Sequence, residues 1–154
     1  MKHIKESKRK SFKKQLKSKL SEGSNSGYYY PTTRTAVYWF GRLNTLLFGN
    51  KLGRVYIEVK KIHNDYGRCV ADWDNRKTPK GKFDQRIIPH HIKVKFYIQL
   101  HCKFKNWNEF IETLAHEMVH LYQMTVLKDP YSNHNANFYK FRPKFAAVGL
   151  SLCR

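Results

Sequence analysis

The sequence predicts an α+β domain in which a small three-stranded sheet, mainly antiparallel, packs on helices. Apolar residues recur at helical spacing in one segment near residue 40 and in two segments after residue 105, and three segments between them alternate apolar and polar residues. A length of 154 residues fits one domain with a single core. The hydrophobic content of 41%, with 10 Tyr, 10 Phe and 3 Trp, is enough to fill that core.

Residues 1–27 are expected to be a basic flexible tail and linker, followed by the folded domain over residues 28–154. The first 20 residues contain nine Lys or Arg and one Glu, and residues 21–27 are rich in Ser, Gly and Asn. Too few apolar groups are present to offset the entropy of ordering this segment alone. A helix could form once a surface neutralises the lysines, because four apolar residues recur at multiples of four: Ile4, Phe12, Leu16 and Leu20.

The first helix of the domain is expected to end at Phe48. Thr33 or Thr35 can cap its start, and its apolar residues follow i, i+3, i+4 spacing. Gly49 is expected to end it, since glycine is the usual residue after a helix.

Three strands are expected next, because apolar and polar residues alternate there. They cover residues 54–60, 67–74 and 90–100, with the second the least regular. Residues 78–89 contain two prolines and one glycine, which predicts a loop or a wide hairpin connection.

The central helix is expected over residues 106–127, where apolar side chains cluster on one face. Asn106 and Glu109 form a plausible capping pair, and Asp129-Pro130 stops the helix. In the final segment, Pro143 bends a helix or starts its last portion. Gly149 is expected as its C-terminal cap.

His116, Glu117 and His120 form a His-Glu-x-x-His motif in the central helix. Since a helix advances about 100° per residue, histidines four apart lie one turn apart on the same face and can offer two ring nitrogens to one Zn²⁺. Glu117 lies beside them, where a carboxylate can take a proton from water. The competing interpretation is that both histidines are solvated residues on the polar face of an amphipathic helix.

A catalytic zinc usually has three protein ligands and one open position, so a third ligand is needed. His134 is the candidate, and it opens an apolar stripe with the spacing of a buried helix face: Phe138, Phe141, Phe145 and Val148. The alternative is a core histidine without a metal, but its position after a complete motif favours a ligand. We exclude four other histidines: His63, His90, His91 and His101.

The stretches TLAHEMVHLYQ and HNANFYKFRPKFAAVGL resemble the SprT-like (Spartan-type) metalloproteases, in which a third His is followed by an aromatic residue and a closing Gly-Leu. Upstream, LNTLLFGNKLGRVYIEV and GRCVADWD are similar to the family's helix and first strands. The resemblance covers about residues 35–150 and implies the SprT-like fold, with the motif on the central helix. Larger members carry a C-terminal zinc ribbon, so this chain, ending at Arg154, is expected to be a small form without one.

Thirty Lys and Arg against 11 Asp and Glu give a formal charge of +19, which predicts a polyanionic partner. No segment has the length of a transmembrane helix or the apolar core of a signal peptide, which predicts a soluble intracellular protein. For such a protein, nucleic acid is favoured over an anionic membrane surface as the partner. The expected contacts are in the basic tail: Lys8, Arg9, Lys10, Lys13, Lys14 and Lys17. Three cysteines without a Cys-x-x-Cys pair indicate an intracellular, reducing location, in the cytoplasm or on the nucleoid, with host and viral origin both open.

These observations predict a zinc-dependent endopeptidase that holds one Zn²⁺ through His116, His120 and His134 and uses Glu117 as general base. The resemblance implies substrates that are bound or crosslinked to DNA. One rival is a non-catalytic zinc-containing DNA-binding or virion protein, which would not need Glu117. A nuclease is a weaker rival, because the acidic residues are few and scattered along the sequence. Three tyrosines are open as oxyanion-stabilising residues: Tyr122, Tyr131 and Tyr139.

Overall fold

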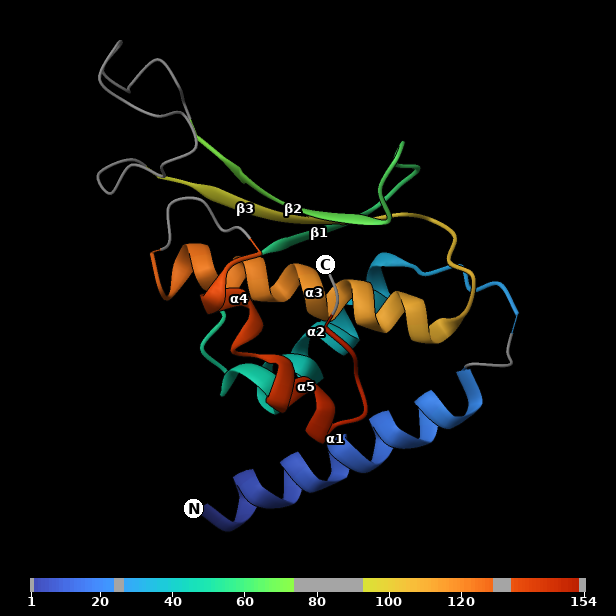
Figure 1. Cartoon of the computed structure of the whole chain (residues 1–154), viewed down its shortest axis with the longest axis vertical. Helices are drawn as coiled ribbons and strands as arrows, with labels where there is room; N and C mark the ends of the chain where they lie inside the picture. Colours follow the sequence, from blue (N-terminus) through green and yellow to red (C-terminus); the bar gives the residue numbers. More distant parts are fainter. Residues whose placement is uncertain (1, 24–26, 74–92, 129–133, 153–154) are drawn as a thin grey trace.

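The computed structural model describes residues 2–23, 27–73, 93–128 and 134–152 (Figure 1). Over these residues the chain is α+β, as predicted. Its elements are α1 (Lys2–Gly23), α2 (Thr33–Phe48), β1 (Tyr56–Val59), β2 (Gly67–Asp72), β3 (Lys95–Leu100), α3 (Trp107–Thr125), α4 (Ala136–Tyr139) and α5 (Arg142–Ala147). None of the described helices combines the length and apolar character that a membrane crossing requires.

The sheet has the order β1-β3-β2 and is mixed rather than mainly antiparallel. β3 pairs antiparallel with β2 and parallel with β1. The prediction of strand direction was incomplete because β1 and β2, although consecutive, are not neighbours. They run in opposite directions, so a strand inserted between them must be parallel to one and antiparallel to the other. The loop expected over residues 78–89 lies outside the described residues.

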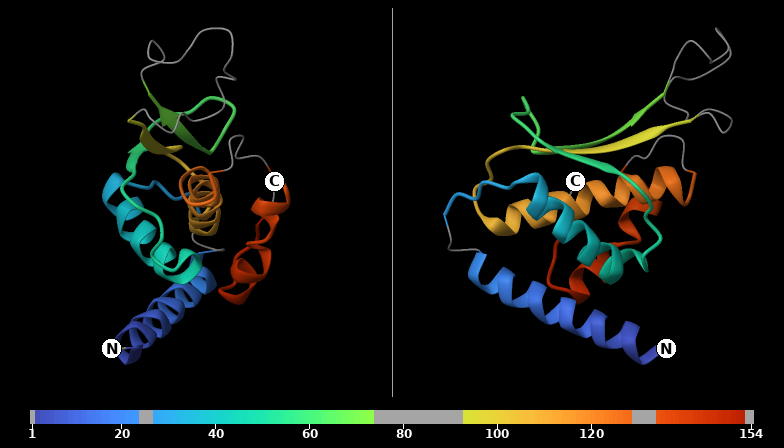
Figure 2. Two further views of the ribbon diagram at one scale, coloured as in Figure 1. Left: turned by 90° about the vertical axis from the view of Figure 1, so that its left-hand side faces the viewer. Right: turned by 180° about the vertical axis from the view of Figure 1, so that it is seen from behind.

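All the described helices lie on one side of the sheet (Figures 1 and 2). β2 and β3 pack on α3, while β1 packs on α2. Ile98 and Leu100 of β3 are fully buried between the sheet and these helices. Figure 2 shows α1 on the far side of this helical layer, so the chain forms a sheet, a middle layer around α3, and an outer helix.

α2 begins with a reciprocal cap between two threonines. Thr32, rather than Thr33 or Thr35, is the N-cap residue, and its hydroxyl accepts a hydrogen bond from Thr35 N at 3.2 Å. Thr35 Oγ1 in turn accepts from Thr32 N at 3.0 Å, which satisfies two backbone donors at the helix start. The predicted end is confirmed, because Gly49 has the left-handed conformation with φ 58°.

α3 begins as predicted, since the side chain of Asn106 accepts a hydrogen bond from Glu109 N at 2.9 Å. The last predicted helix is divided into α4 and α5, and Pro143 lies in the first turn of α5, where its missing N–H has no cost. Gly149 follows α5 with φ 86°. α3 contacts α1, α2, α4, β2 and β3, which makes it the central helix.

Residues 2–23 form α1, which differs from the expected flexible tail. Leu16 is fully buried, and Phe12 and Leu20 pack against the core. Asn108 Nδ2 of α3 donates a hydrogen bond to Leu20 O at 3.1 Å. Phe12, Leu16 and Leu20 thus find their surface on the domain itself, on α2 and α3, rather than on a partner. Of the expected linker, residues 24–26 lie outside the described residues.

Leu16→Ala should lower the free energy of unfolding by about 2–5 kcal/mol, because it leaves a cavity between α1 and the domain. Urea unfolding of the full chain measures this effect. Lys17→Ala is the matched control, since the neighbouring side chain is exposed and its loss should change stability little. Equal stability of the Leu16→Ala and native chains would show that α1 does not dock in solution.

Candidate metal centre

Three histidines come together beside α3. His116 and His120 lie in α3, and His134 directly precedes Asn135, the N-cap residue of α4. One ligand atom from each lies within 4.8 Å of the others, and His116 Nε2 is 3.2 Å from His134 Nε2. Nitrogens about 2.0–2.1 Å from one tetrahedral zinc ion would be about 3.3 Å apart. The three side chains are therefore close enough to hold a metal ion, and the distance between His116 and His134 matches two nitrogens of a tetrahedral zinc site.

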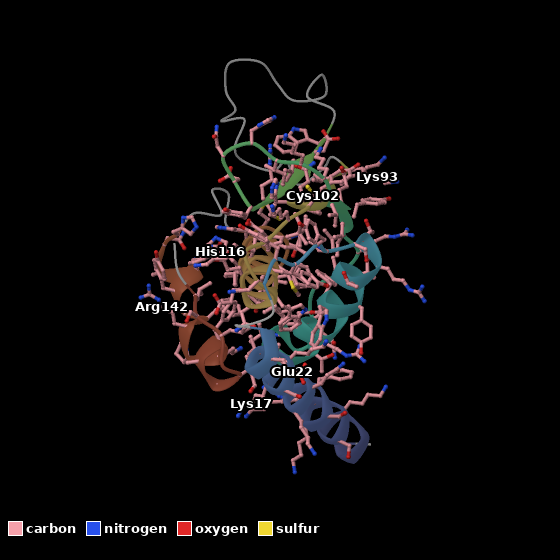
Figure 3. The ribbon with its side chains drawn as sticks, turned by 90° about the vertical axis from the view of Figure 1, so that its right-hand side faces the viewer. Lys17, Glu22, Lys93, Cys102, His116 and Arg142 are labelled. Carbon is pink, nitrogen blue, oxygen red and sulfur yellow. The ribbon has the colours of Figure 1, made fainter. Side chains whose placement is uncertain are left out.

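Phe138 forms the floor of this histidine group. Its ring is fully buried and lies 4.9 Å from the rings of His116 and His120 and 4.7 Å from that of His134. The aromatic residue four positions after His134 thus packs on all three candidate ligands. Figure 3 shows His116 on the side of α3 that faces the C-terminal helices.

Gln123 connects the two segments that carry the histidines, a role that the sequence analysis missed. It is fully buried, and its Oε1 lies 3.1 Å from His120 Nδ1. With the proton on Nδ1, this contact leaves His120 Nε2 available to a metal. Gln123 Nε2 donates to Asn135 Oδ1 at 3.0 Å, and the same oxygen accepts from Phe138 N at 3.2 Å. Gln123 thereby orients one ligand and positions the residue next to another.

Gln123→Ala should weaken zinc binding by about 10- to 100-fold while all three histidines remain, because it removes the partner that orients His120. Competition with a chromophoric chelator measures the affinity. Gln99→Ala, a change of the same size on the sheet, should leave the affinity as it is in the native chain. An unchanged affinity in Gln123→Ala would contradict the orienting role.

Glu117 is buried next to the histidines, with 6% of its surface exposed. Burial, helped by the nearby carboxylate of Asp65, raises the pKa of Glu117 to about 8. A dication held by His116 and His120 would favour the carboxylate and lower that pKa again. The position suits a group that alternately accepts and releases a proton.

Gly67 allows β2 to lie directly against this part of α3. A Cβ at this position would be 2.7 Å from Thr113 Cγ2 and 3.3 Å from Glu117 Cγ. Any larger residue would therefore push the strand from the helix or displace Glu117. The glycine that opens the second strand thus serves the site as well as the fold.

The histidines and Glu117 open onto a cleft of about 710 Å³ between α3 and the edge strand β2. It is lined by Asp65, Tyr66, Gly67, Arg68, Cys69, Glu109, Glu112, Thr113, His116, Glu117, His120, His134 and Ser151. Burial, with the nearby Glu117 carboxylate, raises the pKa of the Cys69 thiol far above its usual range, so Cys69 stays protonated and does not act as a thiolate.

The cleft is acidic although the chain is strongly basic. Four of the 11 carboxylates line it. Arg68 is the one Lys or Arg among the lining residues, and its strand register turns its side chain to the opposite face of the sheet. Burial raises the pKa of Glu112, and its Oε1 accepts a hydrogen bond from Ser151 N at 3.3 Å. The acidic residues, scattered along the sequence, are thus gathered here by the fold. In the described part of the chain the histidines are nevertheless the only group with metal-ligand spacing.

Of the three tyrosines considered as oxyanion-stabilising residues, the two that the structure describes do not line the cleft. Tyr122 packs in the core against Phe48 and Phe141. Tyr139 is absent from the cleft lining, and Tyr131 lies outside the described residues. Tyr66, which the sequence analysis missed because it precedes β2 and is distant from the motif in sequence, does line the cleft.

The candidate nucleic-acid contacts lie on α1. Five of the six are exposed, and Lys13 is half-buried. Arg9 is partly engaged by the domain, since its guanidinium donates to Leu46 O at 3.3 Å. Among the described residues the one ion pair of a Lys or Arg is between Lys60 and Glu58, at 3.7 Å. The described cations of α1 therefore form no ion pair with a described carboxylate.

The excluded histidines stay apart from the site where the structure describes them. His101 Nδ1 accepts a hydrogen bond from Ile62 N at 3.0 Å, and His63 is exposed. His90 and His91 lie outside the described residues.

Comparisons of the chain with protein-family models, with curated proteins and with solved structures gave no match.

Proposed function

We propose that this chain is a zinc-dependent endopeptidase of the SprT-like type, with one Zn²⁺ held by His116, His120 and His134. The observation that carries the proposal is that these three histidines meet on an open cleft beside the buried carboxylate of Glu117. A structural zinc site is normally closed by four protein ligands, whereas a catalytic site has three and an open position. An exposed His134 and an adjacent cleft match the second arrangement.

Glu117 serves as general base. When bound, zinc would lower the pKa of a water molecule and polarise the scissile carbonyl. Glu117 accepts the proton of the attacking water and then donates it to the leaving amine. Its burial limits competing water, and Gly67 keeps β2 close enough to confine it.

An extended peptide can bind along β2. This strand is at the edge of the described sheet, and its first residues line the cleft. The unpaired backbone groups of an edge strand can hydrogen-bond to an added strand, which would hold a substrate backbone beside the histidines. Recognition through the backbone requires little side-chain specificity, so the substrates would be unfolded or flexible segments of proteins.

The preferred segments would be rich in Lys and Arg, because the cleft carries Asp65, Glu109, Glu112 and Glu117. DNA-associated proteins commonly present such segments. Nucleic acid itself would be repelled from the cleft and would bind the exposed lysines of α1, which concentrates enzyme and substrate on one polymer. The acidic cleft also disfavours a nuclease, because its carboxylates would repel a phosphodiester. Among the described residues no group of carboxylates has the spacing to bind the Mg²⁺ that phosphodiester cleavage commonly uses.

The proposal is tested with two fluorescently labelled disordered proteins of equal length, one basic and one acidic. The zinc-loaded chain should cleave the basic protein faster, a chelator should stop cleavage, and added Zn²⁺ should restore it. The double change Glu109→Gln with Glu112→Gln should reduce the preference for the basic protein by about tenfold, while the amide at 112 can still accept from Ser151 N. No cleavage of either protein, or cleavage that a chelator does not affect, would contradict the proposal.

A further inference from the structure

The outer face of the sheet, which is turned away from the helices, carries a different set of residues from the inner face. Ile57, Cys69 and Ile98 point inward and belong to the core or pack against it. The alternate residues form the outer face: Tyr56 and Glu58 of β1, Arg68, Val70 and Asp72 of β2, and Lys95, Tyr97 and Gln99 of β3. In Figures 1 and 2 none of the described helices or strands covers this face.

Two tyrosines form a pair in the middle of this face. Tyr56 of β1 is directly opposite Tyr97 of β3, and their rings are stacked with centroids 5.2 Å apart and an interplanar angle of 28°. On the other side of Tyr97 lies Val70 of β2. A cross-strand aromatic pair stabilises a sheet, but Tyr56 keeps 44% of its surface exposed, so part of the pair remains open to a ligand.

Positive charge surrounds this pair. Five exposed cations follow the outward alternation along the strands or just beyond their ends: Arg54, Lys60, Arg68, Lys93 and Lys95. Two carboxylates accompany them, Glu58 and Asp72, and Glu58 is the partner of Lys60. The face therefore combines an aromatic centre with a net positive border.

We propose that this face binds single-stranded nucleic acid. Tyr56 and Tyr97 would stack on bases, and the surrounding Lys and Arg side chains would contact phosphates. A duplex keeps its bases stacked inside and cannot offer them to the rings, so the aromatic pair favours single strands. The cations alone would accept any polyanion, and it is their combination with paired tyrosines that selects this partner. This inference is independent of the proposed proteolysis, because it uses neither Glu117 nor the histidines.

The experiment measures binding of a fluorescent 15-nucleotide oligo-dT and of a duplex of equal length to the full chain by anisotropy. Tyr56→Leu and Tyr97→Leu should each weaken oligo-dT binding by about 5- to 100-fold, the effect of losing one base–aromatic stack. Duplex binding should stay unchanged, since it uses phosphate contacts. Tyr97→Phe should bind oligo-dT like the native chain because the ring remains. Lys95→Gln should reduce the log–log salt slope for oligo-dT by about 0.7.

Tyr30→Leu is the matched control, because Tyr30 is 63% exposed and is remote in sequence from the sheet. Native oligo-dT affinity in both sheet variants, or an equal loss in Tyr30→Leu or for the duplex, would overturn the proposal. If Tyr56→Leu and Tyr97→Leu lose binding to anionic lipid vesicles but bind oligo-dT like the native chain, the face binds a membrane surface and the proposal is overturned. Glu117→Gln should bind oligo-dT normally, so failure of the protease assay would leave this result standing. Zinc content and the unfolding curve of each variant verify that it folds.

Discussion

Glu117→Gln should abolish proteolysis while the fold and the bound metal are retained. The amide nearly matches the carboxylate in shape, so the buried position beside Gly67 can accept it. It cannot accept a proton from water at neutral pH, and removal of a general base typically costs about 10²- to 10⁴-fold in rate. The measurement is kcat/KM on a labelled basic protein, together with zinc content by mass spectrometry.

The control for this change is Glu112→Gln, which alters another carboxylate of the same cleft and keeps the acceptor for Ser151 N. It should retain most of the activity on a neutral substrate. Cleavage at the native rate by Glu117→Gln would remove the general-base assignment. If both the native chain and Glu117→Gln bind zinc but neither cleaves protein, the result would favour the rival function, a zinc-containing DNA-binding protein.

His134→Ala should remove bound zinc almost completely, and so should the same change at His116 or His120. Loss of a residue that hydrogen-bonds to a ligand, such as Gln123, weakens metal binding by roughly 10- to 100-fold. Loss of one of the three ligands should weaken it more. The Gln123→Ala variant therefore provides an internal scale for the same measurement. Zinc content after dialysis, and affinity by chelator competition, give both values.

His63→Ala is the control for the metal, because His63 is exposed and does not belong to the histidine group. Its zinc content should equal that of the native chain. Full zinc occupancy in His134→Ala would exclude this residue as a ligand. It would then have to be a histidine packed on Phe138 for structural reasons.

Most helices and strands, and the candidate ligands, could be predicted from the sequence. The start of α3 at Asn106 depends on a contact between residues three apart, and the alternation in β3 is a pattern of six residues. His116 and His120 must share a face because both lie on one helix. Such features depend on local backbone geometry, which the order of residues specifies directly.

The tertiary structure decided what depends on distances between segments. Alternation along a strand is the same for parallel and antiparallel partners, so only the insertion of β3 between its neighbours determined the mixed sheet. The apolar stripe of α1 indicated that a helix could form, but not which surface it would pack on. The burial of Leu16 shows that this surface is the domain itself.

The surroundings of the metal centre also came only from the tertiary structure. In the sequence Gln123 is only a polar residue on a helix face. The structure shows that it contacts His120 and donates a hydrogen bond to Asn135. The acidic cleft brings Asp65, before β2, to Glu112 and Glu117 on α3, about fifty residues away along the chain. The sequence by itself determined which side chains could bind a metal. The packing of β2 and α4 on α3 decided how far each of these side chains is buried, how it is oriented and which charges lie around it. These properties depend on neighbours in space, which the order of residues does not give directly.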